Sequence, residues 1–248
     1  MKILVCISHV PDTTSKINFT ENDSKFDSNG VQFVINPYDE FALTRAMWFK
    51  EKQGATVTVV TVGNATTEPT LRKALAIGAD DAIRVNAEAI DGFMVAKELS
   101  DVVKNGGFNL VLAGKESIDY NGGMVPGMLA SFLDYNFVNA CISLEIDGEK
   151  ATISREIDGG KEVLSCNLPL IVAGQKGLVE EKDLRIPNMR GIMMARKKPL
   201  IVVESINSEA GTISVSFEKP TAKSACKMID ADNVGELVNL LHTEAKVI

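Results

Sequence analysis

The stretch NLVLAGKESIDYNGGMVPGM, residues 109–128, decides the fold. It opens with the apolar run 109–114, which is typical of a buried parallel strand, and it leads into a helix expected over about residues 123–134. Between them lies a loop with adjacent glycines at positions 122 and 123. A strand that passes through a glycine-rich loop into a helix is a building unit of parallel α/β sheets.

Strands and helices alternate on the N-terminal side of this unit. Asn36 is suited to cap a helix that has Pro37 at its first position, and Gly54 is suited to end it. The succession predicts a doubly wound, mostly parallel sheet with helices on both faces. By the same reasoning we expect strands at residues 2–8, 31–35, 55–62 and 81–85, and helices at about 37–52, 66–78 and 90–105.

The pattern changes after residue 136. Residues 137–174 alternate apolar and polar side chains, with turn signals at Asp147-Gly148 and Asp158-Gly159. This alternation predicts antiparallel hairpins that extend the sheet.

The last fifty residues are expected to form an arm rather than part of the core. Residues 231–248 should form an amphipathic helix capped near Asp232, and a tail of this kind is either disordered or packed on a partner. We therefore divide the chain into an α/β domain over residues 1–199 and a C-terminal arm over residues 200–248.

Composition excludes several classes of protein. The formal net charge of −7 argues against nucleic-acid binding, which depends on a basic face. No run of eighteen apolar residues is present, so we expect no membrane insertion, and the start MKILVCIS is unlike a signal or transit peptide. The four cysteines form no CxxC pair, which favours reduced thiols in a cytoplasmic protein without a metal site.

No catalytic constellation is evident. The two histidines, His9 and His242, are expected in a loop and in the tail, with no nucleophile that can be paired with them. Asp80 and Asp81 are adjacent, so on a strand they point to opposite faces and cannot act as a dyad. The sequence therefore predicts a protein without catalytic residues of its own.

The loop after residue 114 is the best candidate for a ligand site. Ligands of doubly wound sheets bind at the carboxyl ends of the strands, and glycines let backbone amides approach an anion. The loop matches neither the Walker A pattern nor GxGxxG, and a tight turn without ligand is the alternative. We favour nucleotide binding because Asn36-Pro37 is expected at a neighbouring strand end.

The stretch RIPNMRGIMMARKKP, residues 185–199, is basic and rich in methionine in an acidic chain. Pro187 and Gly191 are expected to shape an exposed turn with Met189 at its tip, suited to several partners because methionine is flexible and polarisable. The alternative is that Met193 and Met194 fill a gap under the C-terminal arm.

Five stretches together resemble one known family. The chain resembles the beta subunit of an electron-transfer flavoprotein over nearly its whole length, and the motifs follow in the family's order. They are KILVCISHVPD (2–12), NPYDEFALTRAMWFKE (36–51), LRKALAIGADDAIRV (71–85), LAGKESIDYNGG (112–123) and, most specific, REIDGGKEVLSCNLPLIVAG (155–174).

The resemblance implies an electron carrier. In that family a beta subunit pairs with an alpha subunit that holds the redox-active FAD, and the heterodimer carries electrons from flavin dehydrogenases, such as acyl-CoA dehydrogenases, to a quinone reductase. The beta subunit usually binds AMP as a structural nucleotide, and in electron-bifurcating relatives it binds a second FAD. A nucleotide-binding regulator of the universal-stress type is the remaining alternative, although it needs neither the hairpins nor the basic loop.

The resemblance also implies site residues. Tyr38 is expected near the isoalloxazine of the alpha subunit's FAD, and the arm is expected to pack on that subunit. Met124 and Pro126 stand where members often have glutamine and glycine, which favours AMP over a second FAD. The expected cofactor-binding residues are Cys6, Asn36, Pro37, Tyr38, Asp39, Val62, Gly114, Lys115, Glu116, Ser117, Ile118, Asp119, Tyr120, Asn121, Gly122, Gly123, Met124 and Val125. The expected partner-binding residues are Glu156, Met189, Ile192, Met193 and Arg196.

Overall fold

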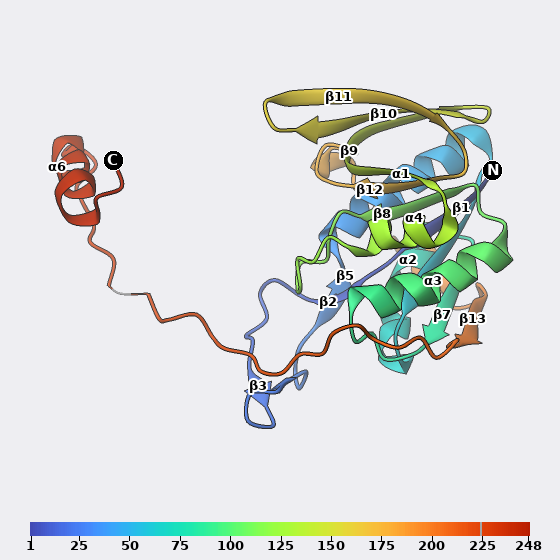
Figure 1. Cartoon of the computed structure of the whole chain (residues 1–248), viewed down its shortest axis with the longest axis horizontal. Helices are drawn as coiled ribbons and strands as arrows, with labels where there is room; N and C mark the ends of the chain where they lie inside the picture. Colours follow the sequence, from blue (N-terminus) through green and yellow to red (C-terminus); the bar gives the residue numbers. More distant parts are fainter. Residues whose placement is uncertain (224) are drawn as a thin grey trace.

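A computed structural model describes residues 1–223 and 225–248, and a nine-stranded sheet forms its centre (Figure 1). The strand order is β11-β10-β9-β12-β8-β1-β6-β7-β13. The sheet is parallel from β9 to β13, and β10 and β11 continue it in antiparallel pairing. Its strands are β1 (Lys2–Cys6), β6 (Thr56–Val62), β7 (Asp81–Asn86), β8 (Leu110–Gly114), β9 (Asn136–Asp147), β10 (Lys150–Ile157), β11 (Gly160–Asn167), β12 (Leu170–Gly174) and β13 (Leu200–Glu204).

Helices cover both faces of this sheet, as the sequence predicts (Figure 1). The helices α1 (Pro37–Gln53) and α2 (Glu68–Ile77) pack on one face, where Leu43 and Leu71 are fully buried. The helices α3 (Gly92–Gly106) and α4 (Val125–Leu133) pack on the other, around Leu99 and Leu129. Every residue of β8 and β12 is buried, because both faces of the central strands are covered.

The direction of winding reverses at β1. From β1 the chain continues through β6 to β7 on one side, and it then returns to place β8 on the other side of β1. The carboxyl ends of β1 and β8 therefore form the crevice in which ligands of doubly wound folds bind. The loop after Gly114 starts at this point.

Two expected strands pair differently from the prediction. Residues 31–35 contribute only β5 (Phe33–Ile35), which pairs antiparallel with β2 (His9–Pro11) outside the main sheet. β12 is not part of a hairpin, because it lies between β8 and β9 and runs parallel to both. The antiparallel extension is confined to β9, β10 and β11, with the turns where Asp147-Gly148 and Asp158-Gly159 predict them.

The C-terminal segment begins as part of the sheet. β13 pairs parallel with β7 as the edge strand, so the arm starts after Glu204 rather than at residue 200. The arm passes a small hairpin of β3 (Phe19–Thr20) and β4 (Lys25–Phe26) and then leaves the body (Figure 1). It ends in α6 (Val234–Leu240), capped by Asn233 rather than by Asp232, and η3 (Leu241–Ala245). Across the described part of the chain, no helix combines the length and apolar character needed to cross a membrane.

Candidate functional site

Asp39 joins the two strand ends at the point where the sheet reverses. One carboxylate oxygen of Asp39 accepts a hydrogen bond from the amide of Ser8 at 2.7 Å, just beyond β1. The other oxygen accepts one from the amide of Gly114 at 2.8 Å, at the end of β8. Asp39 lies in the first turn of α1, so this carboxylate also fixes the start of that helix against the crevice.

The side chains of Asp39 and Cys6 are buried together beneath the crevice. Burial raises the pKa of Asp39 to about 7, although the hydrogen bonds from Ser8 and Gly114 oppose the increase. Burial, reinforced by the negative charge of Asp39, raises the pKa of the Cys6 thiol far above its usual range. Cys6 is therefore a packing residue rather than a nucleophile.

Asn36 holds the glycine-rich loop instead of capping α1. It occupies the N-cap position, but its side chain makes no capping hydrogen bond. Its amide nitrogen donates to the carbonyl oxygen of Glu116 at 2.9 Å, and its side-chain oxygen accepts from the amide of Ile118 at 3.2 Å. The capping prediction is wrong because this long-range contact uses both polar atoms of the side chain. The same contact places Asn36 beside the loop.

The tip of the loop offers unpaired amides to solvent. Residues 119–124 are exposed, and Gly123 has a left-handed φ of +61° that turns the chain toward α4. Within the described residues, the amides of Gly122, Gly123 and Met124 donate to no acceptor. The side chain of Met124 lies against Gly92 at the start of α3 and also passes near Gly122. An anion at the loop tip would find three donors beside the N-terminus of α4.

Lys115 and Tyr38 lie side by side at the base of the loop. The Lys115 ammonium group lies 5.3 Å from the centre of the Tyr38 ring and 3.4 Å from a carboxylate oxygen of Glu116. Both side chains are half-buried. Lys115 is thus the cation nearest in sequence to the loop amides, and Tyr38 presents an aromatic ring at the same strand ends.

Other expected contacts have their side chains in the interior. Cys6 and Val62 belong to the hydrophobic cluster between the sheet and helices α3 and α4. A ligand above the strand ends would therefore reach only the backbone of these two residues.

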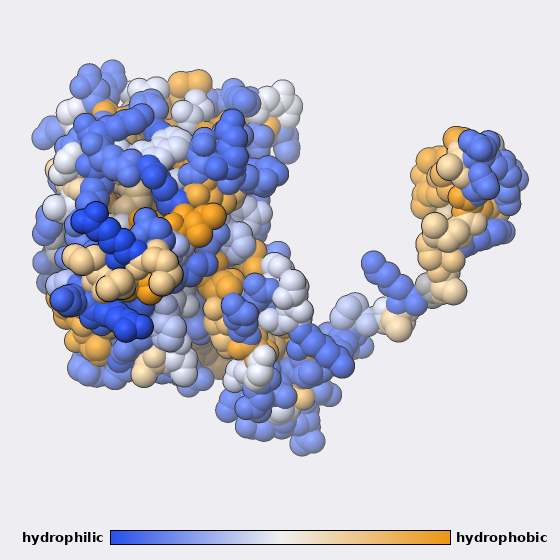
Figure 2. All heavy atoms as spheres, turned by 180° about the vertical axis from the view of Figure 1, so that it is seen from behind, coloured by the Kyte–Doolittle hydropathy of each residue, from blue (hydrophilic) through white to orange (hydrophobic). Residues whose placement is uncertain are grey.

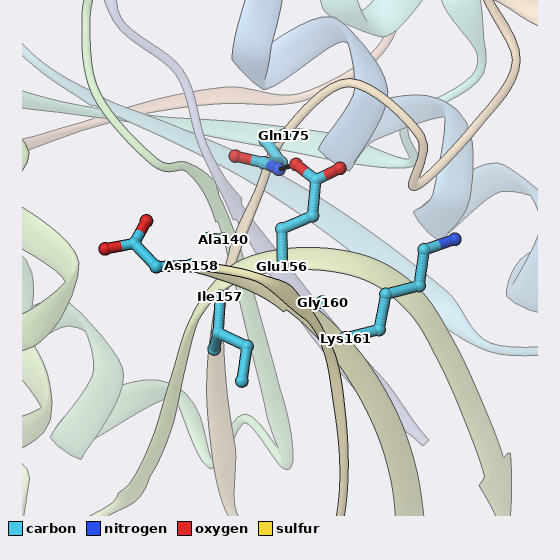
Figure 3. A pocket seen from close by; sticks show the side chains of 7 residues that line it. All are labelled: Ala140, Glu156, Ile157, Asp158, Gly160, Lys161 and Gln175. Carbon is cyan, nitrogen blue, oxygen red and sulfur yellow. Dashed lines mark hydrogen bonds between the residues drawn. The ribbon is translucent and has the colours of Figure 1, made fainter.

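A surface hollow lies beside the hairpin of β10 and β11. In Figure 3 the side chains of Glu156 and Gln175 point toward each other, and the Gln175 amide donates to the Glu156 carboxylate. Ala140 borders the hollow with a left-handed φ of +53°, next to the irregular pairing of β9 with β12. Glu156 and Gln175 also line a second hollow that reaches Tyr38 and Lys115. The Glu156 carboxylate is therefore held on the surface that continues to the strand ends.

Comparison with known proteins agrees with this arrangement. Residues 23–207 match the electron transfer flavoprotein domain family. The chain is 36% identical to the electron transfer flavoprotein subunit beta of Bacillus subtilis over the full length of both chains. It is 36% identical to the subunit of the same name from Syntrophomonas wolfei, covering 91% of this chain and 88% of that one, and 33% identical to that of Bradyrhizobium diazoefficiens over the full length of both.

The chain belongs to the electron transfer flavoprotein beta-subunit family. Its α/β fold, with a large and mostly parallel sheet, is that of the family, and its role is that of an electron-transfer flavoprotein subunit. Among the described residues, no cluster of three or more side chains is arranged to hold a metal ion.

In this member of the family, the basic stretch forms a short helix rather than an open turn. α5 (Met189–Ala195) is capped by Asn188, whose side chain accepts a hydrogen bond from the amide of Gly191 at 2.7 Å. Met189 therefore starts a helix instead of forming the tip of a turn. Met193 and Met194 are exposed and fill no gap under the arm, while Ala195 is the residue of α5 that is buried.

The cations of this stretch divide into two groups. Arg185 pairs with Glu51 through two contacts of 2.9 and 2.7 Å, and Lys198 donates to the carbonyl oxygens of Leu75 and Ala79. These two residues attach the stretch to α1 and α2. Arg190, Arg196 and Lys197 are exposed and form no ion pair within residues 1–223 and 225–248.

We define the docking surface of this stretch as its exposed apolar and cationic side chains. Met189 is 76% exposed and Met193 is 68% exposed, which is unusual for large apolar residues on one short segment. The surface consists of Ile186, Met189, Arg190, Ile192, Met193, Met194, Arg196 and Lys197.

Sequence reasoning missed Gln175 as a member of the site. The available signal was a polar residue directly after the fully apolar strand 170–174, at the carboxyl end of a central strand. Its partner Glu156 lies on a strand that is not adjacent to β12, so the pairing itself could not be read from spacing.

Proposed function

We propose that this chain is the beta subunit of a heterodimer with an electron-transfer flavoprotein alpha subunit. The observation that carries the proposal is the correspondence, over the full length of both chains, to a protein named as a beta subunit. The heterodimer takes electrons from flavin dehydrogenases, such as acyl-CoA dehydrogenases, and delivers them to a quinone reductase. The FAD on the alpha subunit supplies the redox chemistry, and this chain contributes no catalytic residue.

The loop after Gly114 is proposed to hold AMP. Three amides without an intramolecular acceptor lie at its tip, and a single phosphate group has enough oxygens to accept a hydrogen bond from each of them. Lys115 is the neighbouring cation, whereas Glu116 and Asp119 add negative charge to the same loop. One cation beside two acidic side chains favours a ligand with one phosphate over a dinucleotide with two. AMP would therefore serve as a structural ligand that fixes the loop.

Tyr38 and Glu156 are proposed to face the alpha subunit. Both line the same surface hollow, which begins at the strand ends and reaches the β10–β11 hairpin. Tyr38 would lie near the isoalloxazine of the alpha subunit's FAD. Glu156, held by Gln175, would present its second carboxylate oxygen to a cation of the partner.

The docking surface on α5 is proposed to bind the dehydrogenases. Its methionines adapt to differently shaped partners, and its three unpaired cations increase the encounter rate with acidic surfaces. Met189, Ile192, Met193 and Arg196 are the residues assigned to this contact. We also propose a cytoplasmic location, which the free thiols of all four cysteines support.

Expression and cofactor analysis test the function. Expressed alone, this chain should be colourless, whereas co-expression with its alpha subunit should give a yellow heterodimer. Denaturing that heterodimer should release one FAD and one AMP, measured by chromatography and absorbance. Two FAD without AMP would assign the chain to the bifurcating group. Failure to bind any alpha subunit would favour the regulator of the universal-stress type.

A further inference from the structure

The arm runs along the body before it leaves it (Figure 1). We call residues 205–219 the strap. The strap begins after the edge strand β13 and contacts the body at three places, two at α3 and one at the β3–β4 hairpin, where Lys219 also donates to the side chain of Asn18 at 2.8 Å. Beyond it the chain continues to α6, which stands apart from the body.

Glu98 forms the first contact. Its side chain projects from α3 and is 1% exposed, yet no cation pairs with it in the described part of the chain. Its carboxylate accepts hydrogen bonds from the Ser205 hydroxyl at 2.8 Å and from the amides of Ile206 and Ser208 at 3.1 and 3.0 Å. Burial alone would raise the pKa of Glu98, but these donors keep it below its ordinary value. The charge of Glu98 is therefore stabilised by the strap.

Asp91 forms the second contact, and its two carboxylate oxygens accept hydrogen bonds from different segments. One oxygen caps α3 by accepting from the amide of Met94 at 2.8 Å. The other accepts from the amides of Gly211 and Thr212, both at 2.7 Å, and from the Thr212 hydroxyl at 3.1 Å. The second oxygen is thus committed to the strap alone.

Phe217 forms the third contact. Its ring stacks on that of Phe19, with centroids 5.0 Å apart, and its amide donates to the carbonyl oxygen of Asp23 at 2.7 Å. Between the second and third contacts, Ile213 and Val215 are 75% and 77% exposed. Specific contacts at Asp91, Glu98 and Phe217, rather than general apolar burial, therefore define the path of the strap.

The end of the arm is suited to a partner and not to the body. α6 has seven residues, and Val234, Leu237 and Val238 are exposed on it. Figure 2 shows apolar and polar residues side by side at the end of the arm, away from the main body. A helix this short is stable in water only when its apolar face packs on another surface.

We infer that the strap is a positioning device that fixes where the arm leaves the body, so that α6 and the body bind the alpha subunit together. The inference rests on the proposed heterodimer. Once the body has bound the alpha subunit, a short connection keeps α6 close to its own binding surface. This high effective concentration strengthens the second contact. If the strap were released, the connection from the body to α6 would lengthen from residues 220–233 to residues 205–233. Effective concentration falls with about the 3/2 power of length, so affinity should decrease roughly threefold or more.

The test uses the full chain with two substitutions, Asp91→Asn and Phe217→Ala. Asparagine also caps helices, so α3 keeps its cap, while an amide donor replaces the oxygen that faces the donors of Gly211 and Thr212. Val215→Ala is the matched control, because Val215 lies in the strap but is exposed. We expect faster hydrogen exchange at the amides of Gly211, Thr212 and Phe217 in the double variant, and no change in the control.

Affinity for the alpha subunit is then measured in two backgrounds. The double variant keeps the contacts of Glu98 with residues 205–208, so the connection lengthens to residues 209–233, and in the otherwise native chain binding should weaken roughly twofold or more. In a Leu237→Asp background, in which α6 cannot pack, the same substitutions should cause no further loss. If the double variant does not fold, Phe217→Ala alone provides the comparison, with a shorter lengthening of the connection and a smaller expected loss of affinity.

The outcomes separate the strap from the heterodimer. Unchanged affinity, unchanged amide exchange, or an equal loss of affinity in the Leu237→Asp background would each reject the positioning role. A native chain that binds no alpha subunit would instead reject the proposed function itself.

Discussion

Gly191 of α5 lies directly against the carbonyl oxygen of Ala76 in α2. A Cβ atom at position 191 would overlap that oxygen, which belongs to the backbone and cannot turn aside. The close packing of α5, which carries the docking surface, on α2 therefore depends on the absence of a side chain at position 191. Arg72 of α2 stabilises the same packing by donating to the carbonyl oxygens of Ala195 and Lys198 at 2.8 and 2.7 Å.

Gly191→Ala should therefore lower stability. Overpacking against a backbone atom costs about 1–3 kcal/mol, and we expect the loss in denaturant titrations of the purified chain. Gly235→Ala is the control, because a Cβ at position 235 in α6 meets nothing within 4 Å. Equal stability of Gly191→Ala and the native chain would show that α5 can move off α2 freely.

Met189→Ala should affect partners rather than stability. Met189 is 76% exposed, so its truncation removes little from the core, whereas loss of an exposed contact residue can weaken binding by about 1–2 kcal/mol. When the heterodimer is present at subsaturating concentration, we expect an acyl-CoA dehydrogenase to reduce its flavin more slowly in the variant. The melting temperature should be unchanged. Met228→Ala, on the exposed arm, is the control. A melting temperature lowered by several degrees with normal kinetics would contradict the assignment.

The sequence predicts the centre of the fold because its strands carry their own signal. The runs 3–7 and 110–114 are apolar throughout, and strands of that kind are buried on both faces. Pairing is harder to predict. The run 170–174 is equally apolar whether it ends a hairpin or lies between two parallel strands, so its place beside β8 was missed. The edge strand β13 carries the apolar run 200–203, but three of its five residues are exposed, and its pairing with β7 joins positions more than a hundred residues apart.

In the site too, features that lie within one short stretch could be predicted, whereas contacts between distant residues could not. Glycines 122 and 123 and the helix that follows mark the loop in the sequence. The hydrogen bonds of Asn36 to Glu116 and Ile118, however, join residues about eighty positions apart, and local cap chemistry wrongly favoured α1 as their partner. Glu98 and Ser205 are separated by 107 positions, so the strap has no signature in the sequence.

Asp39 should make stability depend on pH. Its pKa is raised by burial from an ordinary 3.8 to about 7 in the folded chain, so between these values the folded state binds more protons than the unfolded state. Its contribution to the free energy of unfolding therefore decreases as pH rises from about 4 to 7, and is constant beyond these limits. Urea titrations at several pH values should show this slope in the native chain.

Asp39→Asn removes the pH-dependent contribution of Asp39 to the free energy of unfolding. Asparagine cannot ionise, and it can accept from only one of the two amides of Ser8 and Gly114. The variant should be less stable near pH 5 than the native chain, and the difference should shrink as pH rises toward 7. A difference that stays constant between pH 5 and 7 would show that the carboxylate is ionised throughout that range.

Gly123→Val tests the loop tip. Position 123 has a φ of +61°, a conformation that β-branched side chains strongly disfavour, and the added atoms would stand beside the free amides. We expect the heterodimer formed with this variant to retain less AMP, measured by chromatography after denaturation, while its flavin is still reduced by a dehydrogenase. Gly148→Val is the matched control, because Gly148 has a φ of +58° in the distant β9–β10 turn. That substitution imposes a similar backbone strain without touching the loop, so it should lower stability and leave the AMP content unchanged. If both variants retained the full amount of AMP, the phosphate group would have to lie away from the amides of Gly122, Gly123 and Met124.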